Sequence, residues 1–110
     1  MDYIIVEGNL TRDPELKFSQ SNSKPYCFFT VAVSYREQRN GSWQDVGTCY
    51  YSCTAFGKMA ENIAESLTKG NRVIVAGRKT TEFYTAKDGS QRTNERINVY
   101  HCGLSLQTAC

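Results

Sequence analysis

The sequence lacks the long hydrophobic run that a membrane span or a signal peptide requires. Its N-terminal segment, MDYIIVEGN, has an acidic residue at position 2 and only four consecutive apolar or aromatic residues, Tyr3 to Val6, against the roughly 18 residues of a spanning helix. Internal repeats, linkers and low-complexity segments are also missing from the 110 residues. We therefore expect one globular domain, no membrane partner and a cytoplasmic location.

Histidine is scarce, and the cysteines lack the spacing of a metal or redox site. The five cysteines include no CxxC pair, and the single histidine is His101. Cys49 and Cys53 bracket two tyrosines in TCYYSCTAFGK, a segment whose composition predicts a strand. On a strand their side chains would share a face about 13 Å apart, whereas a disulfide needs Cα atoms within about 7 Å. We expect reduced cysteines that pack as small hydrophobic side chains, and neither a metal nor another cofactor.

Two further absences concern pairing and catalysis. An odd number of cysteines leaves at least one without an intramolecular mate, so an intersubunit disulfide through Cys110 is an alternative. Nucleophilic catalysis requires a base within reach of the nucleophile, but His101 and Cys102 are neighbours on a predicted strand and point to opposite faces. We therefore expect no enzyme activity.

The net charge of +2 indicates a polyanionic partner only if the basic residues cluster.

The hydrophobic periodicity predicts three strands, a helix and two further strands. Met59, Ile63 and Leu67 recur at helical spacing, and the helix is expected to end at Lys69 before Gly70. A glycine within the long strand that follows provides a bend. The predicted strands are residues 3–8, extended after a bend by residues 15–18, then 26–36, 48–56, 72–84 and 93–102, and the predicted helix is residues 59–69.

Polar segments separate several of these strands. Asn40 and Gly41 form a hairpin dipeptide, but the polar residues on both sides predict a longer protruding loop over residues 37–47, with Trp43 inside it. A second polar loop is predicted over residues 85–92. The strand at residues 26–36 is apolar on both faces, so its second face either packs on a partner subunit or meets a ligand.

This order of elements predicts an all-β protein with a five-stranded Greek-key barrel of the OB-fold type and one α-helix between strands 3 and 4. An SH3-like barrel is the alternative architecture, although it usually lacks a full helix at that point.

Three segments resemble the bacterial single-stranded DNA-binding protein family: GNLTRDPELKF, AFGKMAENIAESLTKG and RVIVAGR. The resemblance covers residues 3–104, so we assign residues 1–104 to an OB-fold domain and residues 105–110 to a short C-terminal end. It implies a homotetramer, a dimer of dimers, that binds and protects single-stranded DNA of any sequence, without catalysis. The implied setting is replication, recombination and repair at the nucleoid.

The resemblance also implies where bases stack. Counting from the FGK motif places two of the family's rings on Tyr50 and Phe56, and counting from RVIVAGR places a third on Tyr84. A fourth falls near Tyr35, with Trp43 either replacing it or packing on its own hairpin. Members of the family usually end in a linker and an acidic tip that recruits repair and replication enzymes. This chain ends in SLQTAC, so such recruitment is doubtful.

Rings and cations are what an unpaired strand requires, because each base exposes a π-face and each phosphate a charge. Tyr50 and Phe56 share one face of their predicted strand, opposite Cys49, Tyr51 and Cys53. We therefore expect an outward row of rings with the cysteines behind it. The predicted phosphate contacts are Lys17, Lys24, Arg36, Arg39, Lys58, Arg78, Lys79, Lys87 and Arg92, with Arg72 and Arg96 as weaker candidates.

Core or subunit packing is expected for the remaining rings Tyr3, Phe18, Phe29, Tyr51 and Tyr100, and either an interface or DNA for Phe28. Two other binding modules are alternatives. A dimeric OB-fold replication-restart protein of the primosome type would differ in assembly mass. A cold-shock-like RNA binder has dense aromatic runs on strands two and three but no such helix.

Overall fold

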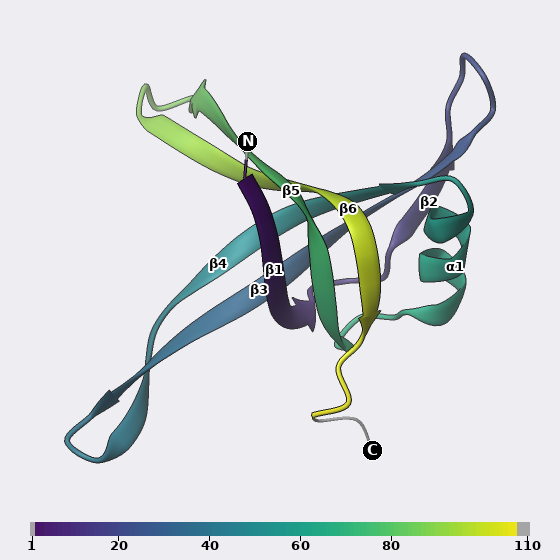
Figure 1. Cartoon of the computed structure of the whole chain (residues 1–110). Coiled ribbons are helices and arrows are strands. Elements are labelled where there is room, and N and C mark those ends of the chain that lie inside the picture. The colour runs from purple at the N-terminus through teal and green to yellow at the C-terminus, as the bar shows by residue number, and fades with distance from the viewer. Residues whose placement is uncertain (1, 108–110) are drawn as a thin grey trace.

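The structure, a computed structural model, describes residues 2–107 as six strands and one helix (Figure 1). In chain order these are β1 (Asp2–Leu10), β2 (Glu15–Phe18), β3 (Pro25–Arg39), β4 (Ser42–Phe56), α1 (Lys58–Ser66), β5 (Arg72–Thr85) and β6 (Gln91–Leu104). Cys110, the candidate for an intersubunit disulfide, lies outside the described residues.

The strands close into a barrel. The sheet order is β1-β5-β6-β4-β3-β2, and β1 also pairs with β3, which closes the sheet on itself. Leu10 of β1 is opposite Val31 and Glu15 of β2 is opposite Phe28, so β1 and β2 follow one another along β3. They form one strand interrupted by a bend, while β4 and β6 pair in parallel. The predicted five-stranded Greek-key barrel with a helix between its third and fourth strands is confirmed.

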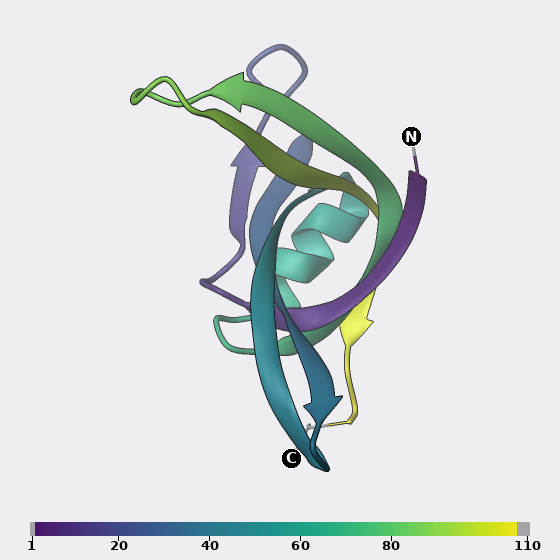
Figure 2. The ribbon, with the colours of Figure 1, turned by 90° about the vertical axis from the view of Figure 1, so that its left-hand side faces the viewer.

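The core consists of the inward side chains of the strands and one face of α1. α1 packs on this core through Ala60 and Ile63, and Figure 2 shows the helix framed by β1, β4 and β5. Each buried aliphatic or aromatic side chain contributes roughly 1.5–3 kcal/mol by leaving water. The largest fully buried side chains are Phe29, Ile97, Val31, Val73, Val75, Cys27 and Cys53.

α1 ends earlier than the sequence predicts, at Ser66 rather than Lys69. Leu67 adopts an extended conformation (φ −114°, ψ 147°) and buries its side chain in the core. The next backbone N–H groups find partners outside the helix: Lys69 donates to Asp13 Oδ1 at 2.7 Å. The tertiary contact of Leu67 therefore outweighs the local helical preference. Within residues 2–107, no helix is long and apolar enough to cross a membrane.

The predicted loop over residues 37–47 is wrong, because β3 and β4 continue through it as a two-stranded ribbon. Arg39 is paired with Ser42, and the turn between them is only Asn40 and Gly41, both with positive φ (52° and 82°). This is the two-residue turn that matches the twist of a hairpin. The ribbon projects from the barrel (Figure 1), so both of its faces are polar and the usual alternation is missing. The second polar loop likewise shortens to residues 86–90.

The rings expected in the core or at subunit contacts divide into two groups. Phe29 and Tyr51 are buried, which confirms core packing for them. Tyr3 and Phe18 are more than half exposed and Tyr100 is 39% exposed. Core packing is therefore wrong for Tyr3 and Phe18, and packing against another subunit stays a prediction for these exposed rings.

Candidate nucleic-acid interface

β4 separates an inward row of side chains from an outward row. Tyr51 and Cys53 are buried, whereas Tyr50 and Phe56 are 60% and 61% exposed. Alternation along the strand produces this division. The predicted outward rings with cysteines behind them are confirmed as geometry, and the role of the rings in binding stays a prediction.

The outward row continues onto β3. Residues directly opposite each other in neighbouring strands share a face. Phe56 is opposite Tyr26, and Thr54 is opposite Phe28. Two further rings, both half-buried, therefore lie on the same outer surface as Tyr50 and Phe56.

The same surface extends in the other direction onto β6 and β5. Arg96 lies beside Ser52 across the parallel pairing, and Thr80 lies beside Arg96. Further along the hairpin, Tyr84 is opposite Arg92. We call this surface the ring face. Its aromatic residues are Tyr26, Phe28, Tyr50, Phe56 and Tyr84, and its arginines are Arg78, Arg92 and Arg96.

A groove of about 740 Å³ opens on the ring face beside Phe56. Tyr26, Phe28 and Thr54 line it, with Lys24 and Arg96 also at its walls. Among the sequence-based contacts, Phe56, Lys24 and the weaker candidate Arg96 line this groove. Phe28, for which the sequence predicts either an interface or DNA, lines it as well. Tyr26 is the ring that the sequence did not single out. The alternation of residues 26–36 puts it on the same face as Phe28, but its position opposite Phe56 needs the register.

Arg96 occupies the middle of the ring face and is held by one ion pair. Its Nε lies 3.0 Å from Glu82 Oε1, and both side chains are about half exposed. Exposed pairs of this kind stabilise a protein by about 0–1 kcal/mol. Breaking this pair to bind a phosphate would therefore lower the stability of the fold only slightly. From the sequence, Arg96 is only one of the weaker candidates.

A β-bulge places Trp43 on the side of the ring face. The pairing skips Val46, since Tyr35 is opposite Gly47 and Arg36 is opposite Asp45. The extra residue reverses the alternation beyond it, so Trp43 falls on the same side as Arg36 and in turn as Tyr50.

Tyr35 lies on the other side of the sheet from the ring face. Its hydroxyl is 3.2 Å from that of Tyr51, and burial together with this hydrogen bond raises the pKa of Tyr51. By the alternation along β3 and β4, Trp43 lies on the same side of the sheet as the ring face, and Tyr35 does not. Phe83, which the sequence did not single out, is 78% exposed but alternates with Tyr84 and faces away from it.

Eight of the nine predicted phosphate contacts are exposed, and Lys79 is the exception. Among residues 2–107, four of them have no carboxylate within 4.0 Å: Lys24, Lys58, Arg78 and Lys87. Four others form exposed ion pairs with a nearby acid: Lys17, Arg36, Arg39 and Arg92. Such pairs are weak, so these cations can also meet a phosphate.

Lys79 is placed differently. Its Nζ lies 3.2 Å from Glu95 Oε2 and the residue is opposite Ile97, a core side chain. Lys79 therefore sits on the inward side of β5, and the structure does not bring it together with the other predicted contacts.

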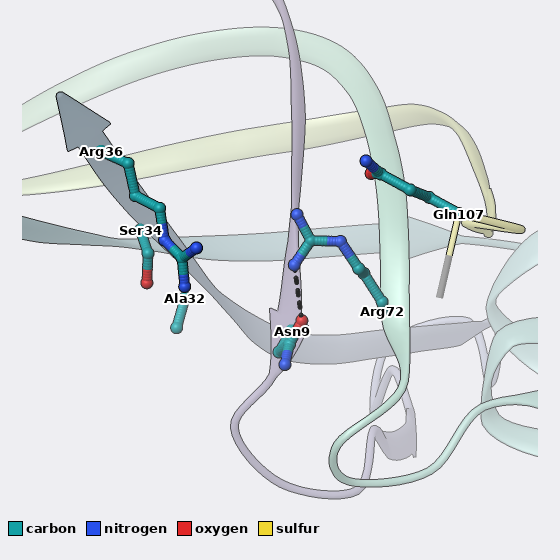
Figure 3. A pocket seen from close by; sticks show the side chains of 6 residues that line it. All are labelled: Asn9, Ala32, Ser34, Arg36, Arg72 and Gln107. Carbon is teal, nitrogen blue, oxygen red and sulfur yellow. Dashed lines mark hydrogen bonds between the residues drawn. The ribbon is translucent and has the colours of Figure 1, made fainter. Parts of the chain in front are cut away.

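Arg36 and Arg72 line a second hollow, of about 560 Å³, between β3 and the β1–β5 pair (Figure 3). Arg72 donates to Asn9 Oδ1 at 3.2 Å and lies 3.4 Å from Glu7 Oε2. Arg36 is paired with Asp45 at 3.0 Å. The side chains of the Arg72–Glu7 pair are only about one-third exposed, whereas those of the Arg96–Glu82 pair are about half exposed. Arg72 is therefore less available to a phosphate than Arg96, and this hollow is a weaker candidate than the ring face.

The thiols serve as packing groups. Burial raises the pKa of the Cys27 and Cys102 thiols to about 11 and raises the pKa of Cys53 as well. Because the thiolate is the nucleophile and metal ligand, protonated buried thiols are unreactive at neutral pH. Over residues 2–107 the cysteines are free, and no three His, Cys, Asp or Glu side chains gather as metal ligands.

The fold defines a class of protein. A five-stranded Greek-key barrel with a helix between its third and fourth strands is an OB-fold, a fold whose members include oligonucleotide-binding proteins. Comparison with known proteins narrows this class. The sequence model of the "Single-strand binding protein family" matches residues 1–105, and the chain belongs to this family.

Relatives and a solved structure agree with that assignment. The chain is 43% identical over 108 residues to a single-stranded DNA-binding protein of Paenarthrobacter aurescens, covering 96% of this chain and 63% of the relative. It is 41% identical over 108 residues to one of Mycolicibacterium smegmatis, covering 96% and 65%. The chain thus spans somewhat less than two-thirds of the length of these relatives.

The crystal structure of the small single-stranded DNA-binding protein from Streptomyces coelicolor is similar with a TM-score of 0.85 and 26% identity, over 98% of this chain and 97% of that one. The OB-fold and the family resemblance predicted from the sequence are both confirmed.

Proposed function

We propose that this protein binds and protects single-stranded DNA irrespective of sequence, without catalysis. The observation that carries the proposal is the ring face, where exposed rings and arginines share one outer surface of the barrel. Relatives named as single-stranded DNA-binding proteins support it. The proposed setting is replication, recombination and repair, in the cytoplasm at the nucleoid.

Stacking explains why such a surface tolerates any sequence. Every base has a π-face, and a base stacked on a protein ring contributes about 1–3 kcal/mol as measured by alanine substitution. Tyr50, Phe56 and Tyr84 are each about half or more exposed, so bases reach them without rearrangement of the barrel. The surrounding cations would hold the phosphates, which carry no sequence information.

A titration of poly-dT at several salt concentrations tests the proposed function. Counterion release predicts that the logarithm of the affinity falls linearly with the logarithm of salt, by about 0.7 for each phosphate neutralised. With several cations around the ring face, we expect a slope of several units. Duplex DNA of the same length is the control and should bind more weakly, because its bases are already stacked. Equal affinity for both, or no binding at all, contradicts the proposal.

We further propose a homotetramer built as a dimer of dimers. Two features of β1 support it. From Asp2 to Gly8, β1 is paired with β5 on one edge, whereas its pairing with β3 involves only Asn9 and Leu10. Among the described residues the other edge of that segment is unpaired, and such an edge can take a strand from a second copy.

An apolar patch lies beside this edge. Tyr3 and Ile5 on β1 are exposed, together with Ile74 and Tyr100, and the rings of Tyr3 and Tyr100 are 6.1 Å apart. Exposed apolar patches of this kind mark interaction surfaces. In this arrangement two chains would pair through the free edge of β1 to form a dimer. The apolar patches of two dimers would then be buried against each other.

The variant Ile5→Asp is expected to reduce the assembly mass, because a carboxylate would have to be buried in the proposed interface. The 66% exposed side chain lets the single chain keep its fold. Sedimentation velocity gives the mass of the parent and the variant, and Ile5→Leu is the matched control that should keep the parent mass. A tetrameric Ile5→Asp protein contradicts the placement of the interface. A parent of two chains favours the dimeric replication-restart module instead.

A further inference from the structure

The groove beside Phe56 has an aromatic lining and a cationic rim. Tyr26, Phe28 and Phe56 supply the rings, Lys24 and Arg96 supply positive charge, and no acidic residue lines it. Its volume of about 740 Å³ falls in the range of small-molecule sites. Arg96 keeps its exposed ion pair with Glu82, and Lys24 has no carboxylate within 4.0 Å among the described residues. Apolar rings together with positive charge match a flat base attached to a phosphate.

The rim of the groove is fixed by hydrogen bonds before any ligand arrives. Ser19 N–H donates to the carbonyl of Lys24 at 2.9 Å, and Gly57 N–H donates to the carbonyl of Pro25 at 2.9 Å. Asn22 Oδ1 accepts from Lys24 N–H at 3.1 Å. A site closed in this way loses little conformational freedom when a ligand binds.

The groove also lies in line with the rings that the family resemblance selected. Tyr50 and Phe56 are on one strand, about 20 Å apart at roughly 3.3 Å per residue, and Tyr26 is directly opposite Phe56. On the far side of Tyr26, the opposite residue is Lys17 of β2. A single DNA strand that runs from Tyr50 past Phe56 therefore enters the groove, and beyond the groove it meets Lys17 as a further cation.

We propose that this groove is an additional nucleotide subsite, in which a base stacks on Tyr26 and Phe28 while Lys24 holds the adjacent phosphate. The inference rests on the proposed single-stranded DNA binding and extends its path over β3 towards β2. Arg96, at the opposite wall, is the second phosphate contact of the subsite.

The backbone around the groove argues against an extended peptide as its occupant. A peptide that adds to a sheet needs a free strand edge, but Tyr26 to Phe28 of β3 pair with β2 on one side and with β4 on the other. Apart from Gly57, the residues that line the groove have side chains. Rings and cations without acids favour a nucleic acid strand over a peptide.

The variant Phe28→Leu tests the subsite, since leucine keeps apolar volume but has no π-face. We expect the affinity for a 16-nucleotide oligo-dT, a length at the upper end of about 4–16 nucleotides for one OB-fold, to fall about 5- to 10-fold. The variant Phe28→Tyr keeps a ring at this position and should bind oligo-dT as tightly as the parent. Phe18→Leu is the matched control: Phe18 is an exposed ring on neighbouring β2, but it alternates with Lys17 and faces away from the groove. It should leave the affinity unchanged.

A fluorescent reporter provides an independent measurement. The variant Tyr26→Trp in a Trp43→Phe background has one tryptophan, placed in the groove, and oligo-dT should quench it by stacking. If Phe28→Leu leaves the affinity unchanged and the reporter is silent while Tyr50→Ala weakens binding, the subsite is overturned and the proposed function stands. If the parent protein does not bind oligo-dT, the proposed function itself fails.

Discussion

Replacing Tyr50 and Phe56 together by alanine is expected to weaken oligo-dT binding by about 100-fold or more. Each ring contributes about 1–3 kcal/mol when a base stacks on it, and two rings at about 1.4 kcal/mol each already give a 100-fold change. Both side chains are exposed by about 60% on the outer side of β4, so their removal leaves the core unchanged. A fluorescence-anisotropy titration at fixed salt measures the effect.

The matched control keeps both rings and exchanges them, as Tyr50→Phe with Phe56→Tyr, and should bind nearly as the parent does. Assembly mass and thermal unfolding should be the same for all three proteins. Parent-like affinity of the double alanine variant would remove β4 from the binding surface, and a changed assembly mass would move these rings into a subunit contact.

The variant Gly77→Ala is expected to lower the free energy of unfolding by about 3 kcal/mol, the upper end for overpacking. Gly77 sits where the register of β5 and β6 shifts. A Cβ atom there would overlap the backbone carbonyl oxygen of Asn98. Relief requires β5 and β6 to separate, because the obstacle is backbone rather than a flexible side chain. Urea unfolding followed by circular dichroism measures the change.

Gly103→Ala on the neighbouring strand β6 is the control for this variant. A Cβ atom at Gly103 would have no described heavy atom within 4 Å, so we expect a change within about 0.5 kcal/mol. Equal stability of the two alanine variants would show that the close approach at Gly77 relaxes without loss. The predicted bend in this long strand would then have another origin.

Local alternation was sufficient to place the side chains of residues 48–56 of β4, on one side of the β-bulge. Whether Tyr50 points out and Cys53 points in depends only on the two-residue period of a strand, which the sequence displays. The order of elements likewise predicted the barrel, because hydrophobic periodicity and turn residues are local signals. The family resemblance added the proposed stacking positions, which periodicity alone does not reveal.

The neighbours of those rings depend on register, which is not local. Arg96 reaches the ring face because β4 and β6 pair in parallel, Ser52 beside Arg96, across a connection that includes α1 and β5. Tyr26 lies beside Phe56 only through the exact pairing of β3 with β4. The sequences of β3, β4 and β6, taken one at a time, do not indicate which residues will be neighbours.

The errors in the predicted elements also have physical causes. The ribbon over residues 37–47 is polar because it leaves the barrel, so polarity suggested a loop where the Asn40–Gly41 turn actually closes a hairpin. The helix ended early because Leu67 buries its side chain in an extended conformation. In both cases the three-dimensional surroundings overrode a local preference.

The parallel seam between β4 and β6 bears on how quickly the chain can fold. It joins Tyr51 to Glu95, so a long stretch of polypeptide must be ordered before this contact yields any stabilisation. Topologies dominated by distant pairings fold in about milliseconds to seconds rather than microseconds. During synthesis β4 emerges before β6, the last strand, so the pairing between them cannot form at once. Until β6 is available, the apolar inner face of β4 remains exposed to association with other chains.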